Sequence, residues 1–141
     1  MSTVLWANVL VGTTVMSEQA DRYALYAHLD KLGALTRQLG LPAFDDFCDT
    51  TDLRYNTDES MELPEGMTST DDLMARDGAW LEAPQAKDVL ERLLGHIRDH
   101  KVRFGLFSNA HDDVVTELTE VLDFLRSQEG EATRFNFSVV M

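Results

Sequence analysis

Apolar and polar residues follow two strand-like patterns at the ends of this chain. Residues 3–11 are mostly apolar, β-branched or aromatic, with Asn8 as the only strongly polar side chain, which predicts a buried strand. Residues 133–141 begin with strict alternation, with Phe135 and Phe137 on one side and Asn136 on the other, which predicts a half-buried strand. Both ends of the chain are therefore expected to lie in one sheet.

Three longer segments have the spacing of amphipathic helices. The first is predicted over residues 17–39, with Ser17 as its N-cap and a stripe of leucines along one face. The second is predicted over residues 84–100 and the third over residues 109–128. Alternation in residues 102–107 predicts a short strand between the second and third helices.

The order of these elements predicts a single α+β domain over residues 1–141. Its small three-stranded sheet would include both chain termini and would be packed by about three helices. The last strand, helix and strand would form a right-handed parallel crossover. A doubly wound α/β fold is the alternative, which three strands make less favourable. The last strand is predicted either inside the sheet or at an edge that pairs with a second subunit, so both a monomer and a homodimer stay open.

A long acidic excursion interrupts the pattern at residues 45–82. It holds twelve of the 25 acidic residues and two arginines, and therefore contributes −10 of the net charge of −13. Because affinity for phosphates comes mostly from Lys and Arg, we expect no direct binding to nucleic acid or to anionic membranes. A basic partner is favoured instead. The competing interpretation is that acidic loops simply keep the protein soluble.

The excursion also contains too many apolar residues for a solvated linker. Aromatic side chains dominate the energetics of protein interfaces, and carboxylates steer partners together. The predicted partner-binding residues are Phe44, Asp45, Asp46, Phe47, Asp49, Asp52, Tyr55 and Trp80. The sequence therefore predicts a non-enzymatic acidic protein-binding module that neutralises or regulates a basic protein.

Histidines suggest an alternative function, a metal-dependent protein or enzyme. His96 and His100 are four positions apart on a predicted helix, a spacing that presents two imidazoles on one face. His111 would supply a third ligand if the chain doubled back. The competing interpretation is that cationic side chains are simply favoured near a helix C-terminus. No other cofactor is expected, and a divalent metal is the one that this pattern allows.

Catalytic motifs give no support for an enzyme. The sequence has no Gly-x-Ser-x-Gly elbow, no Gly-x-Gly-x-x-Gly and no P-loop. Carboxylates surround the lone Cys48 in the sequence, and negative neighbours raise the pKa of a thiol. A single cysteine, the lack of a signal-peptide pattern and the lack of an apolar run of ~20 residues predict a soluble cytoplasmic protein without a membrane partner.

Overall fold

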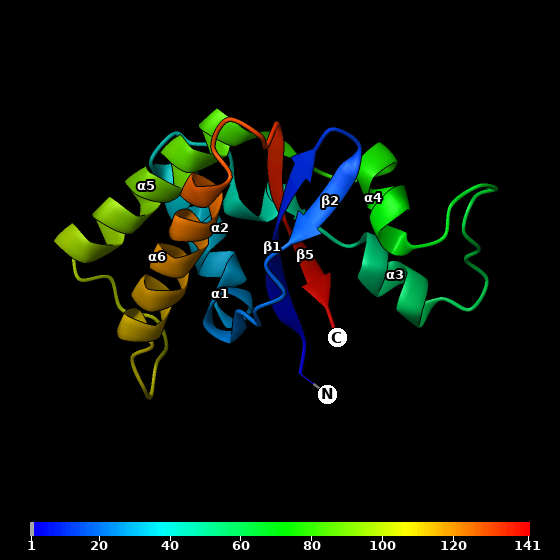
Figure 1. Cartoon of the computed structure of the whole chain (residues 1–141). Coiled ribbons are helices and arrows are strands. Elements are labelled where there is room, and N and C mark those ends of the chain that lie inside the picture. Colours follow the sequence, from blue (N-terminus) through cyan, green and yellow to red (C-terminus); the bar gives the residue numbers. More distant parts are fainter. Residues whose placement is uncertain (1) are drawn as a thin grey trace.

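The sheet is built around the strand nearest the C-terminus. In the computed structural model, which describes residues 2–141, β5 (Arg134–Val140) pairs antiparallel with β1 (Val4–Val11) on one side (Figure 1). On its other side it pairs with two short strands, β3 (Cys48–Asp49) and β4 (Leu81–Glu82). The remaining strand, β2 (Thr14–Ser17), forms a hairpin with β1. Both terminal strands therefore share one sheet, as predicted.

The α+β class is confirmed, but the fold has more elements than the three strands and three helices predicted. The described residues form five strands and six α-helices. The helices are α1 (Tyr23–Ala27), α2 (Leu29–Gln38), α3 (Thr51–Thr57), α4 (Thr70–Asp77), α5 (Ala83–Asp99) and α6 (His111–Ser127). A 3-10 turn, Phe44–Phe47, precedes β3. The excursion is therefore more regular than its composition suggested.

The first helical segment begins later than predicted, because the residues expected to start it form the second strand of a hairpin. Gly12 has a φ of +64°, a conformation that glycine adopts without steric cost, and it reverses the chain after β1. Ser17 then pairs with Asn8 and ends β2 instead of capping a helix. The backbone of Arg22 exchanges hydrogen bonds with Leu5, so the chain stays beside β1 until α1 begins.

Helix α1 receives its N-terminal cap from another helix. The carboxylate of Glu117, on α6, accepts the N–H groups of Ala24 and Leu25 at 3.1 Å each. The buried Arg22 lies beside this cap and forms an ion pair with Glu120 at 3.1 Å. Burial raises the pKa of Glu117, although both N–H groups act in the opposite direction. The N-terminus of α1 is thereby fastened to α6.

The main hydrophobic core lies between one face of the sheet and four helices. Helices α1, α2, α5 and α6 gather on this side in Figure 1, and α3 and α4 lie on the other. The side chains of Leu5, Val9, Phe135 and Phe137 point into this core and are fully buried. The predicted apolar stripe of the second helix is also buried, at Ala86, Val89, Leu90, Leu93, Leu94 and Ile97.

Residues 102–107 form a loop, and the predicted strand and parallel crossover there are wrong. Helices α5 and α6 pack directly against each other, so the connection between them does not enter the sheet. Phe104 is buried, but Gly105 has a φ of +106° and turns the chain outward. The parallel neighbour of β5 is instead β3, which comes from the excursion.

The excursion covers the second face of the sheet. Helix α3 contacts β5 and helix α4 contacts β2. The polar side of the last strand, predicted to face solvent, is therefore buried, with Asn136 0% and Ser138 4% exposed. The alternation correctly separated the apolar from the polar face of β5. The polar face is nevertheless buried, because it packs against polar residues of the excursion.

Buried polar contacts hold the excursion on the sheet. Asn136 accepts a hydrogen bond from the side chain of Asn8 at 3.0 Å and donates one to the carbonyl of Ala79 at 2.8 Å. The buried carboxylate of Asp49 accepts the N–H of Ala79 at 3.0 Å and that of Thr51 at 2.9 Å. The N–H and the carbonyl of Ala79 therefore both have a hydrogen-bond partner on the sheet side. We call Asn8, Asp49 and Asn136 the polar clamp.

The polar clamp predicts that Asn136→Ala loosens the excursion. The change leaves the carbonyl of Ala79 and the amide of Asn8 without this partner, and each unsatisfied buried group costs about 1–3 kcal/mol. We expect a melting temperature lower by several degrees and faster amide exchange in α3 and α4 than in α5 and α6. The control is Gln38→Ala, since Gln38 is exposed at the end of α2 and should leave both measurements unchanged. Equal loss of protection in all four helices would contradict the local role of the clamp.

The central position of β5 predicts that deleting residues 138–141 destroys the fold. The deletion removes Val139 from the core, and buried apolar side chains contribute ~1.5–3 kcal/mol each to a total stability of only ~5–15 kcal/mol. It also removes Ser138, which pairs with both β1 and β3. Near-ultraviolet circular dichroism and solubility should show a molten or insoluble chain. Deleting the half-exposed Met141 alone is the control, and an unchanged melting temperature for the longer deletion would refute the role of β5.

Candidate functional site

The aromatic residues predicted to bind a partner do not share one surface. Phe44 and Phe47 are buried in the core, where the ring of Phe44 lies 5.0 Å from that of Phe137. They attach the 3-10 turn to the sheet, so neither is available to a partner. Tyr55 is partly exposed on α3. The indole of Trp80 donates to the carbonyl of Met74 at 2.8 Å and closes the end of α4.

The predicted acidic contacts divide into structural and free carboxylates. Asp45 accepts two hydrogen bonds from Arg37, at 2.8 and 2.9 Å, and Asp49 belongs to the polar clamp. Asp46 is exposed and forms no ion pair with any residue from 2 to 141. Asp52 accepts hydrogen bonds from Thr70 at 2.8 Å and from Asn56 at 3.1 Å. Of these residues, Asp52 lies at a pocket.

This pocket opens on the second face of the sheet, between β1, β5 and the helices of the excursion. Its volume is about 250 Å³, and its walls include Trp6, Asn8, Asp52, Asp71 and Ser138. We call it the second-face pocket. The strands supply its floor, and α3 and α4 supply one carboxylate each. The polar clamp therefore also sets the distance between its walls.

The second-face pocket presents hydrogen-bond acceptors. The amide nitrogen of Asn8 donates to Asn136 and Ser138 at 3.0 and 3.1 Å, which leaves its carbonyl oxygen to accept. Asp52 and Asp71 form no ion pair with a base in residues 2–141. Burial raises the pKa of Asp71, and the charges of Asp52 and Asp72 raise it further. An entering cation would relieve this unfavourable charge.

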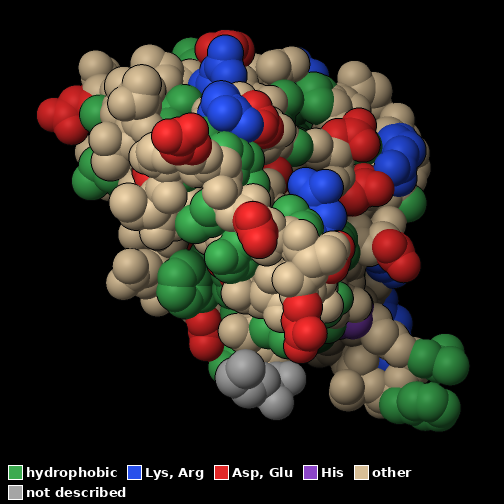
Figure 2. All heavy atoms as spheres, turned by 90° about the vertical axis from the view of Figure 1, so that its right-hand side faces the viewer, with side chains coloured by type: hydrophobic (Ala, Val, Ile, Leu, Met, Phe, Trp, Pro, Cys, Tyr) green, Lys and Arg blue, Asp and Glu red, His purple; other side chains and the backbone are tan. Residues whose placement is uncertain are grey.

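The surface around the pocket carries uncompensated negative charge. Three of the twelve carboxylates in residues 45–82 form ion pairs, those of Asp45, Asp77 and Glu82. The other nine form none with the described residues. Figure 2 shows Asp and Glu side chains spread over this side of the molecule. The acidic segment of the sequence is thus an acidic surface of the fold.

Two of the three histidines predicted to bind metal lie together. The rings of His96 and His100 are 4.4 Å apart at the end of α5. The ring of His111 instead lies 2.7 Å from the carbonyl of Val102, at the start of α6. Within residues 2–141, no three side chains of His, Cys, Asp or Glu are arranged to hold a metal ion. Helical spacing explains the pair, and the loop before α6 explains the separate place of the third ring.

Cys48 has the environment of an inert thiol. Burial raises the pKa of Cys48 far above its ordinary value, and Asp45 and Asp49 raise it further. The thiol also donates to the carbonyl of Phe44 at 3.3 Å. The predicted suppression of the thiolate is confirmed, although burial contributes more than the charges that the sequence showed.

Sequence reasoning missed most of the pocket. Trp6 and Ser138 gave no signal, because each belongs to an ordinary strand pattern. Asn8 was a signal, since it is the only strongly polar side chain in an apolar strand, and its burial now has a cause. Asp71 was hidden among the many acids of the excursion.

Comparisons with protein-family models, with curated proteins and with solved structures found no match to this chain. None of the helices in residues 2–141 is both long enough and apolar enough to span a bilayer. The function is therefore argued from the geometry and charge of the second-face pocket and its surroundings.

The raised pKa of Asp71 predicts that Asp71→Asn stabilises the protein at neutral pH. The folded state binds this proton more tightly than the unfolded state, where the pKa is about 3.9, so the ionised carboxylate is a net cost at pH 7. Because Asp71 is largely exposed, we expect a gain below about 1 kcal/mol. The gain should shrink as pH falls through the folded pKa and vanish below the unfolded one.

Asp112→Asn is the matched control for this prediction. Asp112 also occupies the first turn of a helix, so both variants lose one charge and the same interaction with the helix dipole. The measurement is the melting temperature of each variant between pH 3 and pH 8. If Asp71→Asn is no more stable than Asp112→Asn at pH 7, the charge of Asp71 does not lower the stability of the folded state.

Proposed function

We propose that this protein is a non-enzymatic binding module that attaches to a basic protein through its acidic surface. We define this surface as α3, the loop of residues 58–69 and α4. The observation that carries the proposal is the second-face pocket, in which Asp52 and Asp71 face a cavity without a basic neighbour. A lysine or arginine of the partner would supply the missing cation.

The unpaired carboxylates support a protein partner of opposite charge. Negative groups that already pair internally contribute little to a partner, but nine of those in residues 45–82 form no ion pair with the described residues, and eight of these lie outside the buried polar clamp. Their combined field would attract a positive surface and raise the rate of encounter. Binding would cover the basic surface of the partner and so neutralise or regulate it.

The size and lining of the pocket favour a side chain over a larger free ligand. Its volume of about 250 Å³ is below the ~300–1,000 Å³ of ordinary small-molecule sites. The acceptor oxygens of Asp52, Asp71 and Asn8 match the donors of a guanidinium or an ammonium group. The indole of Trp6, which also lines the pocket, adds an aromatic group of the kind that attracts cations.

The residues that we propose as contacts differ from those predicted from the sequence. Phe44, Phe47 and Asp49 hold the structure together and are not part of the proposed interface. Asp52 and Tyr55 remain in it, because both are partly exposed on α3. Asp71 joins them from α4.

The proposal predicts that the protein binds a short arginine-rich peptide by means of Asp71. We expect the peptide to change the fluorescence of Trp6 and to bind more weakly as salt increases, because opposite charges attract. Asp71→Asn should weaken binding by about tenfold or more, since a partly desolvated charge pair is lost. Isothermal titration calorimetry at low and at high salt measures the salt dependence and the effect of the variant, and a fluorescence titration measures the tryptophan signal.

The control is again Asp112→Asn, which removes the same charge from the other side of the molecule. It should change the affinity by less than about twofold. If the peptide fails to bind at low salt, or binds equally well to the two variants, the proposed role of the pocket is wrong. An Asp71 variant that is more stable and binds less well would show that the charge is kept for binding.

A further inference from the structure

The loop between α5 and α6 carries two adjacent apolar side chains in solvent. Leu106 is 83% exposed and Phe107 is 97% exposed, more than any other large hydrophobic residue described. Figure 2 shows hydrophobic side chains that project beyond the body at its lower edge. Single exposed apolar residues are ordinary, but a projecting pair marks an interaction site. We call Leu106 and Phe107 the loop tip.

The loop tip is held in place by its neighbours. The guanidinium of Arg103 donates to the carbonyls of Gly105 and Leu106 at 2.9 and 3.2 Å. The side chain of Asn109 accepts the N–H of Phe104 at 3.0 Å. These bonds fix the two ends of the loop, so little conformational entropy is lost when the tip is bound.

An apolar pocket of suitable size lies at the opposite end of the same two helices. Its volume is about 440 Å³, and Ala83, Pro84, Leu125 and Ala132 form its apolar wall, with the ion pair of Lys87 and Glu129 at its edge. These residues lie at the beginning of α5 and at and beyond the end of α6, whereas the loop tip follows the end of α5. We call it the helix-end pocket.

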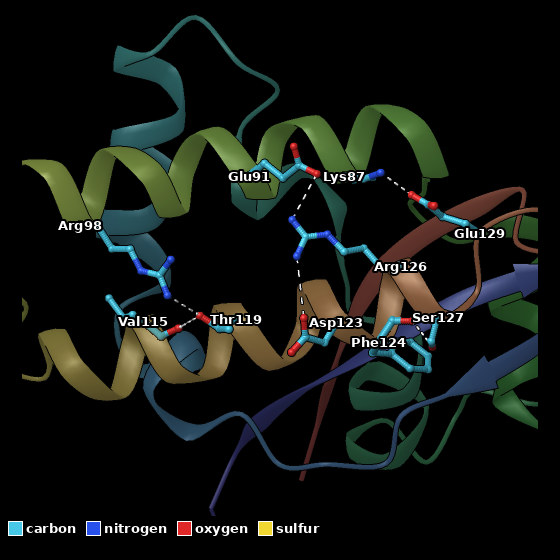
Figure 3. Close-up of polar contacts among 10 residues, drawn as sticks. All are labelled: Lys87, Glu91, Arg98, Val115, Thr119, Asp123, Phe124, Arg126, Ser127 and Glu129. Atoms are coloured by element: carbon cyan, nitrogen blue, oxygen red, sulfur yellow. Dashed lines mark hydrogen bonds and ion pairs between the residues drawn. The ribbon is translucent and has the colours of Figure 1, made fainter.

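The loop tip cannot reach the helix-end pocket of its own molecule. Helices α5 and α6 have 17 residues each, which places their two ends about 25 Å apart. Side-chain contacts hold α5 and α6 together along their length. Arg126 joins Glu91 at 3.4 Å, and Arg98 donates to Thr119 at 3.2 Å (Figure 3). The loop tip could therefore enter this pocket only in another molecule.

We propose that the loop tip of one copy of this chain inserts into the helix-end pocket of a second copy. Lys101 and Arg103 flank the tip. At the pocket Glu129 is already paired with Lys87, which leaves the neighbouring Glu131 as the carboxylate available to the basic tip. Residues 83–134 hold seven bases and ten acids, so the strong negative charge of the excursion lies elsewhere. The contact joins two different surfaces and repeats along a ring or a chain.

Salt separates this contact from the proposed binding of a basic partner. The contact between copies buries apolar side chains of molecules that share a net charge of −13. This shared repulsion outweighs the few local opposite charges, so screening it strengthens the contact. Attachment of a basic protein to the acidic surface weakens with salt. Either function therefore fails or succeeds without the other.

Sedimentation velocity of the full chain between about 10 µM and about 1 mM tests the proposal. The expected result is assembly that grows with concentration and with salt. Leu106→Ser combined with Phe107→Ser weakens assembly at least about tenfold, because both inserted side chains are lost. Met16→Ser, at another exposed hydrophobic residue, leaves assembly unchanged. A wild-type protein that stays monomeric throughout overturns the proposal.

A mixing experiment tests the head-to-tail arrangement. Ala132→Arg blocks the pocket, and Pro84→Arg, at an exposed position, is a second such variant if the first does not fold. Each variant alone is monomeric. An equal mixture of a tip variant and a pocket variant forms a complex of two chains and nothing larger, because one intact tip meets one intact pocket. A mixture that stays monomeric, or a folded pocket variant that assembles like wild type, overturns the proposal.

Discussion

The contact between Asn136 and the backbone of Ala79 is the interaction on which the rest of the structure depends. Asn136 lies in the central strand and is fully buried, so its amide must find partners within the protein. It finds them in Asn8 across the sheet and in the turn that ends α4. A polar strand face and a polar excursion thus satisfy each other. Together with Asp49 and the pairing of β3 and β4 with β5, this contact gives the excursion its place on the sheet.

The two faces of the sheet have different physical roles as a result. On one face, apolar side chains from β1, β5 and four helices form a dry core that supplies stability. On the other, hydrogen bonds position α3 and α4 while their carboxylates remain unpaired. Charge that is unfavourable for the folded chain is concentrated on the less apolar face. Burial and the neighbouring carboxylates raise the pKa of Asp71 on this face, and the proposed basic partner would relieve that charge.

Local patterns in the sequence were sufficient for the elements that bury one regular face. The terminal strands and the stripes of α5 and α6 could be predicted because their periodicity lies within the segment itself. The hairpin of β1 and β2 is local, but it was missed because Ser17 also fits a helix N-cap. The burial of Phe44, Phe47 and Asn136 could not be predicted, because each depends on a partner far away in the chain. The second-face pocket was hidden because its walls come from five separate elements, β1, β2, α3, α4 and β5. Only Asn8 indicated the pocket, because no neighbour in the sequence explains a polar side chain in this apolar strand.

The pairing of β1 with β5 has a consequence for how the chain is made. Asn8 and Asn136 are 128 positions apart, so at ~5–20 residues per second the ribosome adds the second roughly 6–25 s after the first. During that interval the β1–β2 hairpin exists without its central neighbour, and an isolated hairpin is marginally stable in water. The nascent chain therefore exposes an apolar strand edge for seconds. Cellular factors that shield such edges would decide how much of the newly made protein reaches its native state.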